Sequence, residues 1–144
     1  MIILDTNVIS EAVLRNPDTH VADWYRNQTM ENLSTTAITV AELFAGIRRM
    51  PAGRKRNDLS RLIDFQLLML GDRILSFDAA SAIGYAEIRA TREHMGRPIS
   101  IQDAMIAAIA RAHGAAVATR NTKDFEGTGV KLINPWEHAE HTKR

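Results

Sequence analysis

The chain opens with an unbroken apolar run, Ile2-Ile3-Leu4, which is followed directly by Asp5. An apolar run without polar alternation is typical of a strand that is buried on both faces, as in a parallel sheet covered by helices. In open sheets of this kind, ligands bind beyond the carboxyl ends of the strands. We therefore expect Asp5 at the edge of the sheet where a site is normally built, with Thr6 and Asn7 beginning the next turn.

Strand-like and helical patterns alternate along the rest of the chain. Strands separated by helices predict an α/β fold with a mainly parallel central sheet and helices on both faces. We expect four further strands, at 33–36, 73–77, 116–119 and 130–133, and helices after residue 18 and at 39–49, 59–70, 78–93 and 100–113. Asp18 and Asp78 are the expected N-caps of the helices that follow them.

The composition narrows the chemistry that the chain can perform. It has 144 residues and no cysteine, which excludes a disulfide scaffold and any cysteine-based zinc site. We find neither a signal-peptide pattern nor an apolar run near the length of a membrane span, so we expect a cytoplasmic protein without a membrane partner. The 18 basic and 17 acidic residues nearly cancel, so the net charge does not point to nucleic acid.

Glu42 and Asp103 lie near the predicted starts of two helices. With Thr39 and Ser100 as N-caps, each carboxylate occupies the third helical position, close to the partial positive charge of the helix end. Thr39-x-x-Glu42 matches a capping box, and Ser100-x-x-Asp103 is its shorter-chain relative. Taken singly, each pattern favours a structural role for the carboxylate.

A fourth carboxylate, Asp124, follows a predicted strand as Asp5 does, so all four acidic side chains could share one edge of the sheet. Carboxylates that lie close together disfavour joint ionisation, so such a cluster takes up protons or binds a cation. Hard divalent cations prefer oxygen ligands. The cluster therefore predicts a site for Mg²⁺, with Mn²⁺ as the alternative ion, and phosphodiester hydrolysis as the reaction.

Four segments in this order resemble the PIN-domain toxins of the VapC type, especially the FitB-like branch. Together they span nearly the whole chain, which makes the combination far more specific than an isolated Leu-Asp-Thr-Asn motif. The segments are Met1-Ile2-Ile3-Leu4-Asp5-Thr6-Asn7-Val8-Ile9-Ser10, Ala37-Ile38-Thr39-Val40-Ala41-Glu42-Leu43, the helix around Asp103, and the stretch from Val117-Ala118-Thr119-Arg120-Asn121 to Asn134-Pro135-Trp136.

The resemblance implies a single PIN domain at 1–136, followed by a polar C-terminal tail at 137–144. It also implies a Mg²⁺-dependent endoribonuclease that acts as the toxin of a toxin–antitoxin pair. The expected partners are an RNA substrate, a DNA-binding antitoxin of the VapB or FitA kind, and a second copy of the chain in a homodimer or a higher toxin–antitoxin assembly.

By position, Asp5, Glu42 and Asp103 match the three acidic residues of this family. Asp5 and Asp103 are expected nearest the metal, with Glu42 completing the site and orienting water. The fourth position is open between Asp124, which we assign, and Asn121, because relatives differ there. Thr6, Asn121, Arg120 and Arg97 are the candidate substrate contacts.

Other features have two interpretations. The basic stretch at 48–61 is a phosphate-binding surface or a solvated connection between helices. Trp24 and Tyr25 could stack on bases, although aromatic residues in amphipathic helices usually pack inside the protein. His138 and His141 have helical spacing for a metal but lack an evident third ligand.

Two other functions compete with the nuclease. Aspartyl-phosphate phosphatases also begin with a strand that ends in aspartate, but their Asp-x-Asp motif is absent because Asn7 stands at the second position. The second alternative is non-enzymatic: the chain serves mainly as the partner of a DNA-binding antitoxin in an autorepressing complex and has little nuclease activity.

Overall fold

The computed structural model describes residues 1–139, which form a five-stranded sheet in the order β3-β2-β1-β4-β5. Every neighbouring pair in the sheet is parallel, as predicted. The strands are β1 (Ile2–Leu4), β2 (Leu33–Thr36), β3 (Ile74–Leu75), β4 (Ala116–Ala118) and β5 (Leu132–Ile133).

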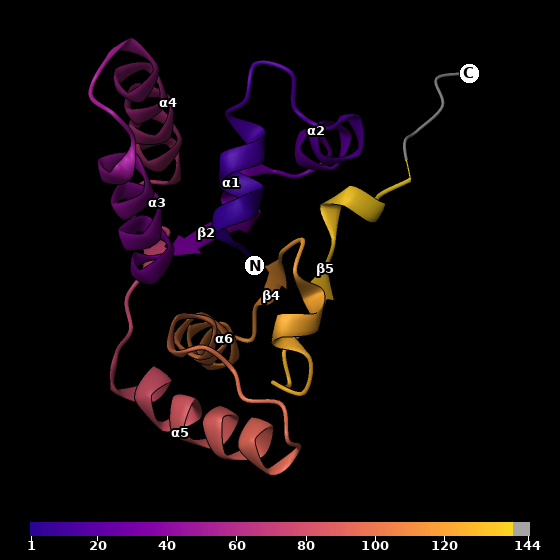
Figure 1. Ribbon diagram of the computed structural model, residues 1–144. Coiled ribbons are helices and arrows are strands. Elements are labelled where there is room, and N and C mark those ends of the chain that lie inside the picture. Colours follow the sequence, from indigo (N-terminus) through magenta and orange to yellow (C-terminus); the bar gives the residue numbers. More distant parts are fainter. Residues whose placement is uncertain (140–144) are drawn as a thin grey trace.

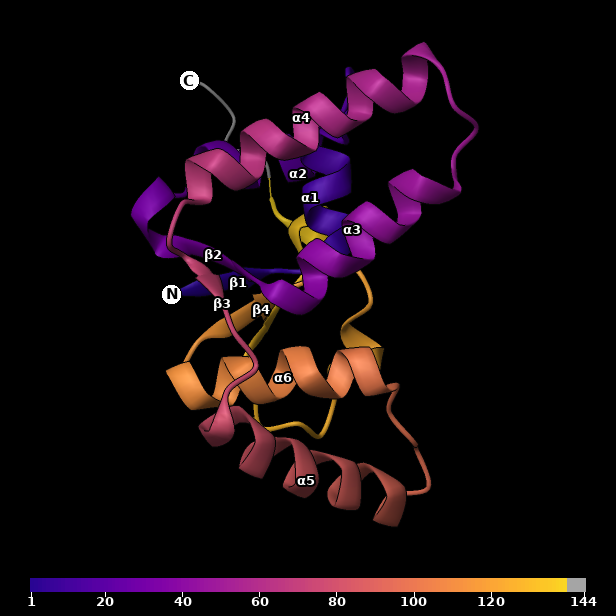
Figure 2. The same ribbon diagram turned by 90° about the vertical axis from the view of Figure 1, so that its left-hand side faces the viewer.

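Helices cover both faces of the sheet (Figures 1 and 2). One face carries α1 to α4, whereas α6 lies against the other face with α5 packed outside it. The helices are α1 (Thr6–Ala12), α2 (Thr19–Arg26), α3 (Ala37–Arg49), α4 (Arg54–Leu70), α5 (Ala79–His94) and α6 (Ile101–His113), with 3₁₀ turns η1 (Met30–Asn32), η2 (Thr122–Phe125) and η3 (Pro135–Glu137).

Successive residues of the central strands supply the two hydrophobic cores. Ile3 and Val117 belong to the core beneath α5 and α6, while Leu4 and Ala118 belong to the core beneath α1 to α4. All four side chains are fully buried. The apolar run at the N-terminus therefore forms a strand buried on both faces, as expected for a parallel sheet.

The chain changes direction across the sheet between β1 and β4. After β1 it builds outward to β2 and β3, and then returns to place β4 on the other side of β1. Leu4 pairs in register with Ala118, and the Asp5 amide donates to the carbonyl of Ala118 over 2.9 Å. Such a topological switch point is the preferred place for a ligand site in open α/β sheets.

The structure corrects three local expectations. The helix α4 begins at Arg54, five residues before the predicted start at 59. Thr6 and Asn7 do not form a simple turn but begin α1, because the Asp5 side chain itself caps that helix. The cap of α3 is Thr36 and not Thr39: the Thr36 hydroxyl accepts from the Thr39 amide over 3.0 Å. The helix therefore starts directly at the end of β2.

Three other predicted caps are confirmed. The side chains of Asp18, Asp78 and Ser100 accept hydrogen bonds from the first turns of α2, α5 and α6, respectively. Gly114 ends α6 with a φ of 60°, a left-handed conformation that glycine adopts without a Cβ clash.

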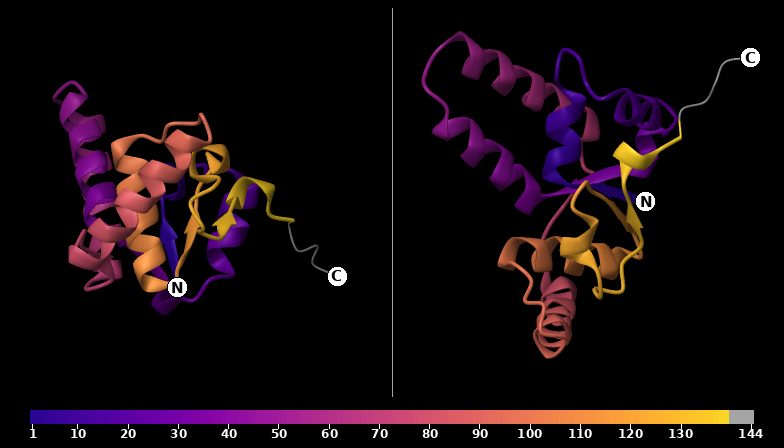
Figure 3. Two further views of the ribbon diagram at one scale, coloured as in Figure 1. Left: turned by 90° about the horizontal axis from the view of Figure 1, so that it is seen from below. Right: turned by 45° about the vertical axis from the view of Figure 1, so that its right-hand side comes forward.

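The end of the described chain lies beside α2 (Figure 3). His138 contacts Asp23 over 2.9 Å, and its carbonyl bonds the His20 ring over 2.8 Å. His141, the second half of the predicted histidine pair, lies outside the described residues. Within residues 1–139, no helix has the length and apolar character needed to cross a membrane.

Candidate active site

A cavity of about 410 Å³ opens at the carboxyl edge of the sheet, between the starts of α1 and α6 and the side of α3. All four predicted carboxylates line it, although they come from four separate parts of the chain. The lining residues are Asp5, Thr6, Asn7, Ser10, Glu42, Asp103, Asn121, Asp124 and Phe125.

Asp5 lies deepest among the carboxylates, with only 6% of its surface exposed. One carboxylate oxygen accepts from the Thr6 amide over 2.8 Å, and the other accepts from the Thr119 hydroxyl, also over 2.8 Å. These bonds fix the orientation of the carboxylate at the junction of β1 and α1.

Thr119 is a site residue that the sequence prediction did not identify. It is fully buried, and its hydroxyl oxygen also accepts from the Asn121 amide over 3.1 Å. The pairing of Leu4 with Ala118 brings Asp5 and Thr119 side by side, since each follows its strand. The sequence does show a polar residue, Thr119, directly after a predicted strand. Its closeness to Asp5 can be inferred only if that strand is known to lie next to β1.

Glu42 lies in the second turn of α3, so the predicted capping box with Thr39 is wrong. Its carboxylate accepts a hydrogen bond from the Thr6 hydroxyl over 2.9 Å instead. Thr6, a predicted substrate contact, therefore also holds Glu42 toward the cavity. This bond links α1 to α3 directly beside Asp5.

Asp103 is in the first turn of α6, as predicted. Its amide donates to the Ser100 hydroxyl over 3.1 Å, while its carboxylate lines the cavity. Ser100 is thus the cap, and a hydrogen bond from its hydroxyl group to the Asp103 carboxylate also lowers the pKa of Asp103. The start of the helix adds a favourable local potential for an anionic side chain.

Asp124 and Asn121 both line the cavity, from η2 and the residue before it. Both side chains are exposed. The choice between Asp124 and Asn121 as the fourth residue of the site, which the sequence left open, therefore stays open in the structure.

The four carboxylates are poorly neutralised. Burial raises the pKa of Asp5, although hydrogen bonds from Thr119 and Thr6 oppose that rise. Burial also raises the pKa of Glu42, with a smaller contribution from the charge of Asp5. Among residues 1–139, no lysine, arginine or histidine forms an ion pair with any of the four.

Asp103 is the most perturbed of these groups. Burial raises its pKa to about 6, and the charges of Asp5, Asp124 and Glu42 push in the same direction. Repulsion among carboxylates in one cavity is the state that a bound cation relieves. The raised pKa of Asp103 therefore reflects its burial first and the neighbouring carboxylates second.

The donor chemistry fits a hard divalent cation. In the described part of the chain, no three acidic or histidine side chains form a ready-made cage around one metal ion. Mg²⁺ does not require such a cage, because it keeps several waters and is usually held by one or two carboxylates together with substrate phosphates. The four carboxylates that share this cavity supply enough oxygen ligands for that arrangement.

The two arginines among the predicted substrate contacts, Arg120 and Arg97, lie at different distances from the acidic cavity. The Arg120 amide donates to the Asn7 side chain over 3.3 Å, and its guanidinium lies 5.1 Å from the centre of the Trp136 ring. Arg97 pairs with Glu126 over 2.9 Å and bonds the Lys123 carbonyl over 3.3 Å. Arg120 therefore stays close to the cavity, whereas Arg97 is engaged with the loop behind Asp124.

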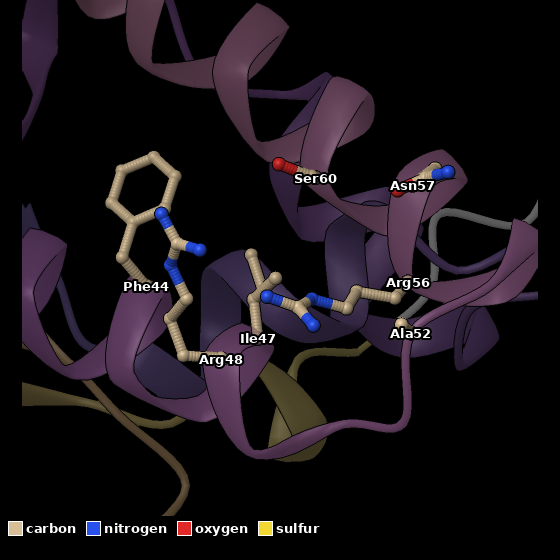
Figure 4. Close-up of a pocket in the computed structure, with 7 residues that line it drawn as sticks. All are labelled: Phe44, Ile47, Arg48, Ala52, Arg56, Asn57 and Ser60. Atoms are coloured by element: carbon tan, nitrogen blue, oxygen red, sulfur yellow. The ribbon is translucent and has the colours of Figure 1, made fainter.

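The basic stretch at 48–61 covers the end of α3, the short connection at 50–53 and the first half of α4. The two helices project together from the sheet (Figure 2). A second cavity of about 290 Å³ lies between these helices, and the side chains of Arg48 and Arg56 extend into it on either side of Ile47 (Figure 4). Because this cavity shares no lining residue with the acidic cavity, we do not assign it to the same site.

The aromatic pair of α2 packs inside the protein. Trp24 is 5% exposed in the core beneath α1 to α4, and the Tyr25 hydroxyl donates to Gln66 over 3.3 Å. Neither residue lines the acidic cavity. The packing interpretation of these aromatic residues is therefore confirmed for Trp24.

Known proteins resemble the chain over almost its whole length. The family model described as PIN domain matches residues 2–131. The chain is 49% identical to the plasmid stability protein StbB of Pseudomonas syringae, covering 95% of this chain and 99% of that protein. It is 45% identical to the VapC ribonuclease Y4jK of Sinorhizobium fredii, covering 96% and 100%. A chain in the structure of FitAB bound to an IR36 DNA fragment superposes with a TM-score of 0.89 at 40% identity, covering 99% and 100%.

Proposed function

The chain belongs to the PIN-domain family, and from that premise we propose that it is a Mg²⁺-dependent endoribonuclease that acts as the toxin of a toxin–antitoxin pair. One observation carries this proposal: four carboxylates from separate elements line a single cavity at the switch point of the sheet. The 45% identity to a VapC ribonuclease supports RNA as the substrate.

Asp5 is the central residue of the proposed site and would bind the Mg²⁺ ion. Its orientation is fixed by Thr6 and Thr119, so it presents its carboxylate to the cavity without reorganising during the reaction. A carboxylate fixed in this way would hold a cation without reorganisation, and the cation would supply the positive charge that stabilises the transition state. Asp103 and Asp124 lie across the same cavity and complete the ligand set.

Glu42 orients the attacking water in this proposal. Its carboxylate accepts one bond from Thr6, which leaves its remaining lone pairs for water. Burial raises the pKa of Glu42, and this direction favours uptake of a proton from that water. When bound, Mg²⁺ supplies positive charge that neutralises the carboxylates and stabilises the charge on the phosphodiester.

We also propose an antitoxin that covers the acidic cavity. A guanidinium or ammonium group can pair with carboxylates and occupy the space of a cation. The related chain of the FitAB structure supports assembly with a second protein and with DNA. On this chain, Leu62, Phe65, Leu68 and Met69 of α4 are exposed apolar side chains that a protein partner could cover.

The FitAB–DNA structure also favours a second candidate role, in which the chain mainly serves an antitoxin–DNA complex that represses its own gene. This role needs no metal and no catalysis. It therefore predicts that Asp5→Asn leaves complex formation and operator binding intact while the wild-type protein cuts no RNA.

One experiment separates the two roles. Antitoxin-free wild-type protein, Asp5→Asn and the matched surface variant Asp58→Asn are incubated with total RNA and with a transfer-RNA pool in Mg²⁺. Discrete fragments from wild type and Asp58→Asn, but not from Asp5→Asn, support the nuclease. The absence of fragments from folded wild-type protein, together with operator binding by its antitoxin complex, supports the repressor role.

A further inference from the structure

A buried arginine outside the acidic cavity holds the loop that carries Asp124. Arg92, in the last turns of α5, is only 4% exposed. Its guanidinium donates three hydrogen bonds to backbone carbonyls: to Arg97 over 2.7 Å, to Asp124 over 2.7 Å and to Glu126 over 2.9 Å. Within residues 1–139, no carboxylate forms an ion pair with it.

The burial of the Arg92 charge costs free energy, which its hydrogen bonds to the carbonyls must offset. Burying a charge without a counter-ion is unfavourable, and the carbonyl oxygens offset that cost only while all of them keep their positions. The planar guanidinium has donors in a fixed fork, so it sets the relative positions of the carbonyls that it binds. Arg92 therefore ties the turn before α6 to the loop that contains η2.

The loop has further internal constraints. The Thr128 hydroxyl donates to the Phe125 carbonyl over 2.6 Å, and the Phe125 side chain is 1% exposed. Gly127 has a φ of 75°, and a Cβ at this position would lie 2.9 Å from the sulfur of Met95 and 3.6 Å from Arg92. A side chain at 127 would thus strain the backbone and also press on Met95.

The side chain of Asp124 has no comparable support of its own. It is exposed, and among the described residues no hydrogen bond fixes its carboxylate. Its position in the cavity therefore depends on the backbone of η2 and the residue after it, to whose carbonyls at Asp124 and Glu126 Arg92 donates hydrogen bonds.

We infer that Arg92 is a positioning residue, which fixes Asp124 in the acidic cavity through its three carbonyl bonds and does not itself touch substrate. The inference rests on the proposed nuclease function. It adds a residue on a helix that contributes no residue to the lining of the cavity.

The first test is a double-mutant cycle between Arg92→Lys and Asp124→Asn, with RNA cleavage as the readout. Lysine keeps the positive charge, but its three donors share one nitrogen, so it lacks the fixed fork that sets the spacing of the three carbonyls. We expect Arg92→Lys to lower kcat at least tenfold in the wild-type background, with KM changed less than threefold. In the Asp124→Asn background, the same substitution should change kcat less than threefold, because its target is already lost.

Arg89→Lys is the matched control, since Arg89 lies one turn earlier on α5 and pairs with Glu93 at the surface. It should leave kcat within twofold of wild type. Gly127→Ala disturbs the same loop from another side, so its effect should also depend on Asp124. Equal losses for Arg92→Lys in both backgrounds would overturn the positioning role.

A second readout does not depend on nuclease activity. Amide hydrogen exchange in Arg92→Lys, measured under conditions where the variant is folded, should accelerate at least tenfold at 122–127 and at the turn 97–100. The exchange of the β1 and β4 amides should stay as in the wild type. Unchanged exchange at 122–127 overturns the inference even if the wild type cuts no RNA, whereas accelerated exchange together with inactive wild type refutes only the nuclease.

Discussion

Replacing Asp103 by asparagine should stabilise the metal-free protein at neutral pH. The carboxylate is partly buried beside Asp5, Asp124 and Glu42, and this surrounding raises its pKa to about 6 from the usual 3.8. The folded state therefore holds the proton of Asp103 more tightly than the unfolded chain does. Asparagine keeps the size and the backbone amide that bonds Ser100 but carries no charge. It therefore removes the cost of burying that charge and the repulsion from the neighbouring carboxylates.

The magnitude follows from the pKa difference. At about 1.4 kcal/mol per pKa unit, the difference corresponds to about 3 kcal/mol. Because Asp103 is only partly buried, screening by solvent reduces this to about 1 to 2 kcal/mol. The sign follows from linkage: wild type carries no penalty below about pH 3.8, loses stability as pH rises toward 6, and carries the full penalty above 6.

The assay is urea unfolding of wild type and Asp103→Asn in EDTA, from pH 4 to pH 8. We expect the variant to be about 1 to 2 kcal/mol more stable at pH 7.5 and nearly equal to wild type at pH 4. Asp58→Asn, on the exposed surface of α4, should stay within about 0.5 kcal/mol of wild type. A lower stability of Asp103→Asn at pH 7.5 would refute the repulsion argument and assign Asp103 a capping role.

Four further outcomes follow from the same contacts. Thr36→Ala should cost about 0.5 to 2 kcal/mol in thermal or urea unfolding, because it removes the cap of α3, and no loss would reject Thr36 as the cap. Gly127→Ala should lower stability by about 1 to 3 kcal/mol, since its φ of 75° and the contact with Met95 both disfavour a Cβ; unfolding unchanged from wild type would contradict this. The rate of RNA cleavage should fall as pH drops through about 6, and the midpoint should move lower as Mg²⁺ rises, because protons and metal compete for Asp103; a midpoint independent of Mg²⁺ speaks against shared carboxylates. Raising Mg²⁺ at constant ionic strength should weaken antitoxin binding in a calorimetric titration, and unchanged affinity would show that the two do not share the cavity.

The end of β1 and the starts of α2, α5 and α6 were predictable from the sequence because they depend on local chemistry. The apolar run Ile2-Ile3-Leu4, followed by Asp5, locates the carboxyl end of β1 even when the neighbouring strands are unknown. The caps Asp18, Asp78 and Ser100 are polar residues directly before helical patterns, and each makes the expected bonds. The rule that carboxyl ends of parallel strands meet at one edge then brings the candidate carboxylates together.

Competing local signals caused the errors around α1 and α3. Thr36 and Thr39 can both cap a helix, and the sequence does not say which amide lacks a partner. Asp5 serves both as cap of α1 and as a cavity carboxylate. A prediction that gave it a single role therefore missed the helix that follows.

Contacts between distant segments could not be predicted in this way. The bond from Thr119 to Asp5 requires the pairing of β4 with β1, and that strand order is a property of the whole fold. Arg92 is one of several arginines on amphipathic helices, and only the packing of α5 against the 122–127 loop distinguishes it. For the same reason Arg97, which looked like a phosphate contact, is engaged with Glu126.

The proposed dependence of RNA cleavage on a bound metal is tested by removing the metal and then restoring it. Antitoxin-free protein is dialysed against EDTA, and the cleavage of RNA is then followed as Mg²⁺ or Mn²⁺ is added back, beside Asp5→Asn as control for contaminating nuclease. We expect no cutting in EDTA, saturable recovery of discrete fragments with either ion, and no recovery for Asp5→Asn. Cutting that persists in EDTA, or equal cutting by Asp5→Asn, would contradict a metal-dependent carboxylate site.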